Sequence, residues 1–173
     1  MTSIGLRPAT ADDAVAIAAL ALQVFLDTYA TDGVRPDLAR EAFHGYSVEA
    51  FQQRLAESHR KFIVAERGTA MVGFVEAQCE RHDAPAPEVA GAELVRLYVQ
   101  PRSQRSGVGR LLLEKAEQIA IELGHRALWF TVWDGNQRAI AFYETMGYRD
   151  VGTTLYAFEG NSYGNRVMAK TLR

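Results

Sequence analysis

The segment Gln104-Arg-Ser-Gly-Val-Gly109 carries the strongest indication of the fold of this chain. It follows a strand-like run at residues 93–100 and opens a strongly periodic helix at residues 108–123. A strand that turns through glycines into a helix leaves several backbone N–H groups unpaired, and the helix dipole adds positive potential there. Gly107 and Gly109 have no Cβ, so an anion can approach the main chain, and positive backbone torsions cost little at both positions. The turn therefore predicts a diphosphate site.

The residues around this turn support an anion site and exclude two familiar versions of it. Four basic residues flank the glycines: Arg102, Arg105, Arg110 and Lys115. No Gly-Lys-Ser/Thr follows, so the turn is not a nucleoside-triphosphate loop, and Leu112 stands where Gly-x-Gly-x-x-Gly needs its third glycine. The alternative is a tight connection relieved by glycines, with arginines that are only solvated.

Three separate segments resemble the Gcn5-related N-acetyltransferase (GNAT) superfamily. Gln104, Gly107 and Gly109 fill the fixed positions of its acetyl-coenzyme A motif, which is Arg or Gln, two residues, Gly, one residue, then Gly or Ala. Residues 93–101 are similar to the family's fourth strand. Residues 136–148 are similar to its second signature, which has an Asn, then an Ala, then Phe-Tyr, then Gly and an aromatic residue.

The resemblance implies a fold and a set of cofactor contacts. The fold would be α/β, a single mixed and mostly antiparallel sheet with splayed central strands flanked by helices, in one acetyltransferase domain over residues 1–173. The co-substrate would be acetyl-coenzyme A, bound by Leu97, Val99, Gln104, Arg105, Ser106, Gly107, Val108, Gly109, Arg110, Asn136 and Tyr143.

Hydrophobic periodicity independently predicts alternating helices and strands. Helices are expected at residues 11–25, 51–56, 108–123 and 136–147, and strands at 61–66, 71–79, 93–100, 126–133, 148–158 and 165–172. Thr10 is the expected N-cap of the first helix, residues 67–70 form a hairpin turn, and residues 82–92 form a surface loop. The helix from Val108 would bury Val108, Leu111, Leu112, Ala116, Ile119, Ala120 and Leu123 and end at Gly124.

Composition fits an ordinary globular protein. The 173 residues are 48% hydrophobic and 23% charged, which suits one domain with a sizeable core. A net charge of −2 argues against nucleic-acid or anionic-membrane partners. No apolar run approaches the ~18 residues of a membrane span, and no secretory signal is apparent, so we expect a cytoplasmic protein. The histidines form no pair or cysteine cluster that predicts a metal site. Cys79, the single cysteine, reads as a small buried hydrophobe.

Tyr143 is the expected catalytic acid. Asn136 lies seven residues before it, which on a helix returns to nearly the same face. The GNAT resemblance implies that the Tyr143 phenol faces the coenzyme A sulfur, where a proton donor helps the thiolate to leave. The alternative is a tyrosine that is half-buried for packing, with its hydroxyl in water.

Glu93 is the first candidate for the base. The attacking amine must be neutral, and an aliphatic amine is almost fully protonated near neutral pH. Strand alternation puts Glu93 on one face with Val95, Leu97 and Val99, where apolar surroundings would raise its pKa. A solvated carboxylate at a strand end is the competing interpretation. Glu76 and His82 are weaker candidates.

The acceptor is the least determined part of the reaction. Residues 27–57 carry six acidic residues and three arginines, a local balance of −3 that suits a cationic amine and is similar to polyamine acetyltransferases of the PaiA type. Solvated surface carboxylates explain the same pattern. We expect direct attack by a primary amine of a small molecule or peptide, in a ternary complex. The rival is a non-catalytic acyl-coenzyme A sensor on the same fold. The oligomeric state is not determined by the sequence, and a homodimer is compatible with it.

Overall fold

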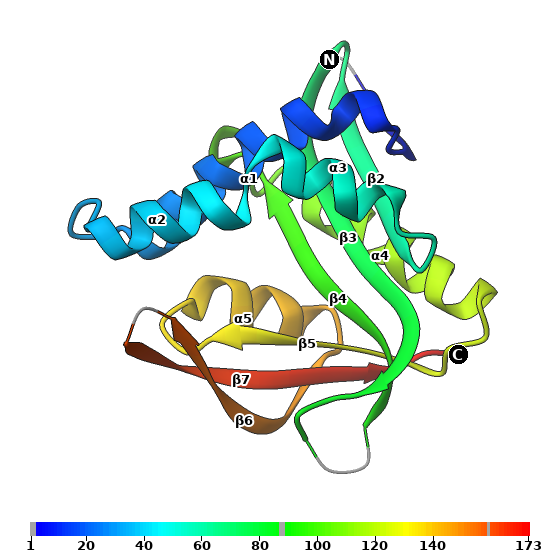
Figure 1. Cartoon of the computed structure of the whole chain (residues 1–173). Helices are drawn as coiled ribbons and strands as arrows, with labels where there is room; N and C mark the ends of the chain where they lie inside the picture. Colours follow the sequence, from blue (N-terminus) through cyan, green and yellow to red (C-terminus); the bar gives the residue numbers. More distant parts are fainter. Residues whose placement is uncertain (1–2, 87–88, 159) are drawn as a thin grey trace. The chain divides into compact units, whose positions relative to one another are not determined.

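The computed structural model describes residues 3–86, 89–158 and 160–173 (Figure 1). The helices are α1 (Ala14–Tyr29), α2 (Pro36–Gly45), α3 (Val48–Ala56), α4 (Val108–Glu122) and α5 (Gln137–Thr145). The strands are β1 (Ile4–Pro8), β2 (Arg60–Arg67), β3 (Ala70–Asp83), β4 (Ala90–Val99), β5 (Ala127–Trp133), β6 (Arg149–Phe158) and β7 (Asn161–Thr171). Short 3-10 turns, Ala11–Asp13 and Pro101–Ser103, precede α1 and follow β4.

The strands form one mixed sheet in the order β1-β2-β3-β4-β5-β7-β6. β1 pairs with β2, β5 with β7, and β6 with β7, all antiparallel. β4 and β5 pair in parallel, with Ala92 opposite Leu128 and Glu93 opposite Trp129. A mixed, mostly antiparallel sheet with helices is the predicted fold class, and it is confirmed.

Contacts divide the chain into two compact units. The first unit contains Met1–Ala77 and Arg96–Ala116, and the second contains Gln78–Val95 and Glu117–Arg173. Strands β3 and β4 and helix α4 therefore contribute residues to both. The single domain expected over residues 1–173 stays a prediction.

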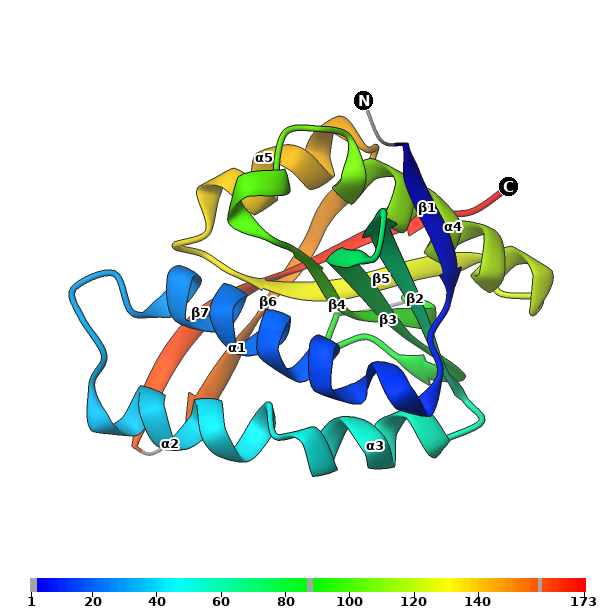
Figure 2. The ribbon, with the colours of Figure 1, turned by 90° about the horizontal axis from the view of Figure 1, so that it is seen from above.

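The core of the first unit lies where α1 and α3 cover β2 and β3. Small and branched side chains of α1, such as Ile17 and Ala21, are fully buried, and they pack with Phe51 of α3 and with Phe62 and Phe74 of the sheet. Figure 2 shows α1 with α2 and α3 running alongside it. The buried positions of α1 recur at helical spacing, so this face of the helix is set by the sequence itself.

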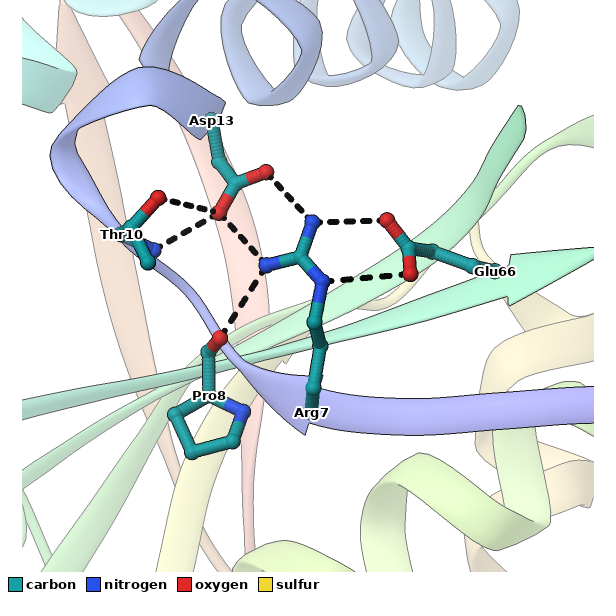
Figure 3. Close-up of polar contacts among 5 residues, drawn as sticks. All are labelled: Arg7, Pro8, Thr10, Asp13 and Glu66. Atoms are coloured by element: carbon teal, nitrogen blue, oxygen red, sulfur yellow. Dashed lines mark hydrogen bonds and ion pairs between the residues drawn. The ribbon is translucent and has the colours of Figure 1, made fainter. Parts of the chain in front are cut away.

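An ion network fixes the start of the first unit (Figure 3). Arg7 of β1 donates two hydrogen bonds to Asp13, both of 2.8 Å, and two to Glu66 of β2, of 2.6 and 3.1 Å. The Asp13 carboxylate also accepts the backbone N–H of Thr10, the predicted N-cap, at 2.7 Å. Hydrogen bonds from Arg7 lower the pKa of Asp13 to about 2. The network joins the first two strands to the beginning of the helical segment.

The second unit is built around β5, which lies beside β7 and the β6–β7 hairpin (Figure 1). An aromatic group packs Phe130 of β5 against Tyr143 of α5 and against Tyr148, with ring centroids 4.1 and 5.1 Å apart. The Tyr148 hydroxyl donates to Glu117 at 2.9 Å, and the Lys170 ammonium donates to the same carboxylate at 2.9 Å. These contacts tie the last turns of α4 to β7.

Two sequence predictions about secondary structure are wrong in detail. Helix α2 was not expected, because only Leu38 and Ala42 of its residues are buried and such a sparse apolar pattern resembles a loop. The loop expected at residues 82–92 is shorter, since β3 continues to Asp83 and β4 already begins at Ala90. Part of that loop, residues 87–88, lies outside the described residues. Long strands carry charged residues on a solvated face, which hides their ends.

The buried face of α4 and the setting of Cys79 also differ from expectation. Leu113 is fully buried, whereas Leu111 and Leu123 are 39% and 51% exposed. A helix face can rotate by one position without changing the apolar period, so the sequence alone does not fix which leucines face inward. Cys79 is partly exposed rather than buried. In the described part of the chain, no helix combines the length and the apolar character that crossing a membrane needs.

Candidate functional site

The turn between β4 and α4 presents a run of unpaired backbone donors. Arg105 and Gly107 adopt positive φ angles of 62° and 87°. Their left-handed conformations alternate with the ordinary ones beside them, an arrangement that turns successive N–H groups toward one side and is typical of anion sites in proteins. The backbone N–H groups of residues 105–110 have no acceptor among the described residues. This is the arrangement that the glycine pattern predicts.

The two glycines of this turn do different things. Gly107 has a positive φ, a backbone conformation that favours glycine. A Cβ built on Gly107 would meet no atom within 4 Å, so the space in front of this residue is open. Gly109 lies in the first turn of α4 and is not among the residues with positive φ, so the expectation of a positive torsion there is wrong. Helical geometry starts at Val108, and a helical residue has ordinary negative φ. Open space in front of Gly107 is what a bulky anion requires.

Side chains of the turn hold its shape rather than point at a ligand. The Gln104 amide donates to the Val99 carbonyl at 3.0 Å, and the Ser106 hydroxyl donates to the Ser103 carbonyl at 2.6 Å. Val108 is fully buried, so it offers only its N–H. The basic side chains Arg102, Arg105 and Arg110 are exposed. The groups of this turn that are open to a ligand are therefore backbone amides and exposed arginine side chains.

The end of β4 offers a further backbone donor. The Gln100 N–H donates to the Val72 carbonyl of β3 at 2.9 Å. Because N–H groups of successive strand residues point in opposite directions, the Val99 N–H points away from β3. Leu97 and Val99 are both partly exposed. In the second unit, Leu94 and Val95 are not among the residues of β4 that pair with β5, so the ladder between these strands ends at Glu93.

Glu93 and Tyr143 lie on opposite faces of the sheet in the second unit. Glu93 is directly opposite Trp129, and paired residues of neighbouring strands share a face. Phe130, the next residue of β5, points to the other face, where its ring contacts Tyr143. Glu93 is partly buried. The face that Glu93 was expected to share with Leu97 and Val99 involves both units, and it stays a prediction.

Tyr143 is buried, with 8% of its surface exposed, so packing accounts for its ring. The Tyr143 ring contacts the rings of Phe130, Phe142 and Tyr148. The hydroxyl has no hydrogen-bond partner among the described residues, and it is not sealed from solvent. Burial raises the pKa of the Tyr143 phenol above its ordinary value. The hydroxyl therefore stays protonated and is free to donate.

Asn136 has a structural partner that the sequence analysis did not predict. It is the N-cap of α5, and its side-chain oxygen accepts the Ala139 N–H at 3.1 Å. Its backbone is not helical, with φ −87° and ψ 60°. The argument that places Asn136 and Tyr143 on one helix face therefore fails, because it assumes helical geometry at both residues.

Glu76, the second candidate for the base, is held by two arginines. Its side chain is 0% exposed and accepts from Arg60 at 2.7 Å and from Arg96 at 2.5 Å. Each carboxylate oxygen of Glu76 accepts a charge-assisted hydrogen bond from a guanidinium, so neither oxygen is left open to an incoming amine. His82 lies in β3, but its side chain is outside the described part of the structure. Among the described residues, no group of three His, Cys, Asp or Glu could hold a metal ion.

The sequence matches a family model described as "Acetyltransferase (GNAT) family" over residues 27–148. This chain belongs to the GNAT family. The matched region contains the run of open backbone donors at residues 105–110, called the cradle below, together with Glu93 and the segment with Asn136 and Tyr143.

Relatives and solved structures agree with GNAT membership. An uncharacterized N-acetyltransferase in the pepI 3' region of Lactobacillus delbrueckii subsp. lactis is 23% identical over 147 residues, which is 85% of each chain. The ribosomal protein bS18 alanine N-acetyltransferase of Escherichia coli K12 is 30% identical over 61% of this chain and 65% of its own length. The PaiA N-acetyltransferase of Thermoplasma acidophilum, crystallised with coenzyme A, superposes with a TM-score of 0.76 at 22% identity, over 98% of this chain and 99% of that one.

Sequence reasoning missed a group of arginines inside this GNAT chain. Arg96 of β4 lies over the rings of Tyr46 and Phe51, at 5.5 and 5.8 Å from their centroids. Arg54 of α3 also lies over Phe51, at 5.0 Å. Glu76 could have indicated these arginines, because a carboxylate within an apolar strand needs cationic partners when it is buried.

Proposed function

We propose that this protein is an N-acetyltransferase that moves the acetyl group of acetyl-coenzyme A to a primary amine by direct attack in a ternary complex. The observation that carries the proposal is the run of unpaired N–H groups at residues 105–110, which suits a diphosphate. Membership of the GNAT family supports the same co-substrate, and the Thermoplasma PaiA enzyme was crystallised with coenzyme A.

The cradle would hold the diphosphate through the backbone. Unpaired N–H groups at the start of α4 carry partial positive charge, and the helix dipole adds to it. The exposed Arg102, Arg105 and Arg110 would add salt-dependent attraction for the phosphates. The partly exposed Leu97 and Val99 of β4 would contact the apolar part of the same molecule.

The Val99 N–H would polarise the thioester carbonyl. It points away from β3, so it is available to the developing oxyanion. A preorganised backbone donor at this position stabilises the tetrahedral intermediate more than the ground state.

Tyr143 would act on the departing sulfur. Burial raises its pKa, so the phenol is a hydrogen-bond donor throughout the working pH range. Complete proton transfer from the Tyr143 phenol to the thiolate is unfavourable, since the ordinary pKa of a thiol is about 8.5 and that of a phenol is about 10. We therefore assign Tyr143 to stabilising the thiolate by a hydrogen bond that strengthens as charge develops.

Glu93 would accept the proton of the amine, directly or through water. Glu93 and Tyr143 lie on opposite faces of the sheet in the second unit, which supports separate roles for the two side chains. No covalent intermediate is involved. The acceptor is a small molecule or peptide amine; the Escherichia coli relative is named for an alanine of ribosomal protein bS18.

A broad amine panel with acetyl-coenzyme A, read by thiol release, tests the function. We expect turnover with at least one primary amine and intersecting initial-rate plots, because both substrates must be bound together. Parallel plots would show a covalent intermediate. Coenzyme binding without turnover on the whole panel would identify a sensor instead of an enzyme.

The substitution Glu93→Gln tests the base. It removes the proton acceptor, so activity should fall near neutral pH and recover partly at high pH, where more of the amine is already neutral. The measurement is the initial rate from pH 6.5 to about 10, with the exposed Glu144→Gln as control. An unchanged pH profile in Glu93→Gln would remove the assignment.

A further inference from the structure

A cationic group lines the aromatic core of the first unit. Arg54 and Arg96 both lie over the Phe51 ring, and Arg60 reaches the same carboxylate as Arg96. Among the described residues, two carboxylates, those of Glu57 and Glu76, pair with these three guanidinium groups, so one positive charge has no ion-pair partner there.

Arg54 carries that uncompensated charge. Its guanidinium donates to the Gly45 carbonyl at 2.9 Å and forms no ion pair with any described residue. Burial and the like charge of Arg96 lower the pKa of Arg54. A cation in this setting gains from a nearby anion, because partial burial weakens the screening by water.

Arg96 is positioned like a binding residue. Glu76 holds one end of its guanidinium, and the rings of Tyr46 and Phe51 support its plane. The donors on Nε and Nη2 have no acceptor among the described residues, and they are not sealed from solvent. A planar guanidinium fixed on one side with open donors on the other suits an oxyanion such as a carboxylate.

The cluster lies on the opposite face of the sheet from the cradle. A Cβ on Gly73 of β3 would approach Val108 and Leu112 of α4. The next residue, Phe74, therefore faces the other way, and it packs against Phe51 and Tyr98. An anion at this cluster would therefore be a different group from a diphosphate at the start of α4.

We propose that Arg54 and Arg96 bind a carboxylate of the acceptor, which makes amino acids and similar small amino-carboxylates the substrates in place of polyamines. The inference rests on the acetyl transfer proposed above. Arg96 precedes Val99 by three strand residues, about 10 Å at the usual rise, so one small molecule can reach both. A hydroxyl pair, Tyr46 and Tyr98 at 3.2 Å, offers a further donor beside Arg96.

The local charge of residues 27–57 favours a cationic polyamine, but most of the acidic residues behind that charge are exposed or already paired. Of the acidic residues at positions 27–57, Asp27, Asp32 and Glu49 are exposed. Asp37 pairs with Arg35 at 2.9 Å, and Glu57 pairs with Arg60. Exposed charges are screened and contribute little to recognition, whereas the arginines of the interior are not.

Matched pairs of amines test the proposal: L-lysine against cadaverine, L-ornithine against putrescine, and L-methionine against its decarboxylated amine. We expect kcat/KM, expressed per neutral amine, to be at least tenfold higher for each amino acid, through KM. Equal rates within the pairs, or faster reaction of the decarboxylated amines, would overturn the assignment.

Three variants locate the effect. Arg54→Gln removes the charge and keeps a donor for Gly45, so it should abolish most of the preference while leaving the decarboxylated amines and coenzyme A affinity unchanged. Arg54→Lys should retain part of it, because a point charge replaces the planar fork. Arg40→Gln, an exposed arginine of α2, is the control. A loss shared equally by both amines of a pair, or a loss of coenzyme A affinity in Arg54→Gln, would show a structural role instead.

Calorimetric titration of the same amines in the presence of coenzyme A separates this proposal from the reaction itself. Carboxylate-dependent binding without thiol release would contradict acetyl transfer and support the subsite. Acetylation of amines whose binding ignores the carboxylate would support the reaction and refute the subsite.

Discussion

The turn at residues 104–110 and the segment at residues 136–148 use their polar groups in opposite ways. In the turn, six consecutive backbone N–H groups, at residues 105–110, have no acceptor in the described chain. In the later segment, Asn136 caps its own helix and the Tyr143 ring is packed among aromatic neighbours. Both segments match a family signature, so the match alone does not say which residues bind a ligand.

Within a sequence signature, the polar groups that have no partner in the fold are the best candidates for ligand binding. A buried or helix-end polar group that folding leaves unsatisfied is costly unless a ligand or water pairs with it. The turn therefore has no structural reason for its open donors. The later segment has structural reasons for Asn136 and for the Tyr143 ring, and only the Tyr143 hydroxyl is left without one.

The largest expected effect on activity comes from removing the Tyr143 hydroxyl. Tyr143→Phe keeps the ring and removes the donor, so turnover should fall roughly 10- to 1000-fold with little change in coenzyme A affinity. The matched control is Tyr148→Phe, which lies in the same aromatic group and loses its bond to Glu117. The control should lower stability and spare turnover. Full activity in Tyr143→Phe would make the whole later segment structural.

The next effect concerns the cradle. Gly107→Val should fill the open space above the turn and weaken coenzyme A binding at least tenfold, about 1.4 kcal/mol. Gly124→Val is the control, because Gly124 follows the other end of α4 with φ 85°, against 87° at Gly107. Both variants carry the same backbone strain, so only Gly107→Val should change the affinity measured by calorimetry. Equal affinities in two folded variants would remove the diphosphate from this turn.

The smallest effect separates capping from binding at Asn136. Asn136→Ala loses the cap of α5 and should lower the free energy of unfolding by about 1 kcal/mol. Ser47→Ala is the control, since Ser47 caps α3 by accepting the Ala50 N–H at 3.2 Å. Denaturant unfolding should give similar losses for both. A coenzyme A affinity that falls in Asn136→Ala, and not in Ser47→Ala, would restore a ligand-binding role to Asn136.

Much of the fold could be predicted because its signals are local. The periodicity of α1 and α4, the cap at Thr10 and the glycine turn before α4 each depend on residues close together in the chain. Helix α2 was not predicted because few of its residues are buried. The ends of β3 and β4 were not predicted because strand pairing depends on residues that are distant in the chain. The role of Asn136 escaped because a helix cap and a ligand contact use the same amide.

The residue order was enough to predict the family and the turn with open backbone donors at residues 105–110, since backbone conformation there follows from neighbouring residue types. The partners of the ionisable groups came only from the three-dimensional packing. The packing put Glu76 between Arg60 and Arg96, left Arg54 without an ion-pair partner among the described residues, and set Glu93 and Tyr143 on opposite faces. The physical reason is that charge acts through space and through burial, and neither distance nor burial is written in the order of the residues.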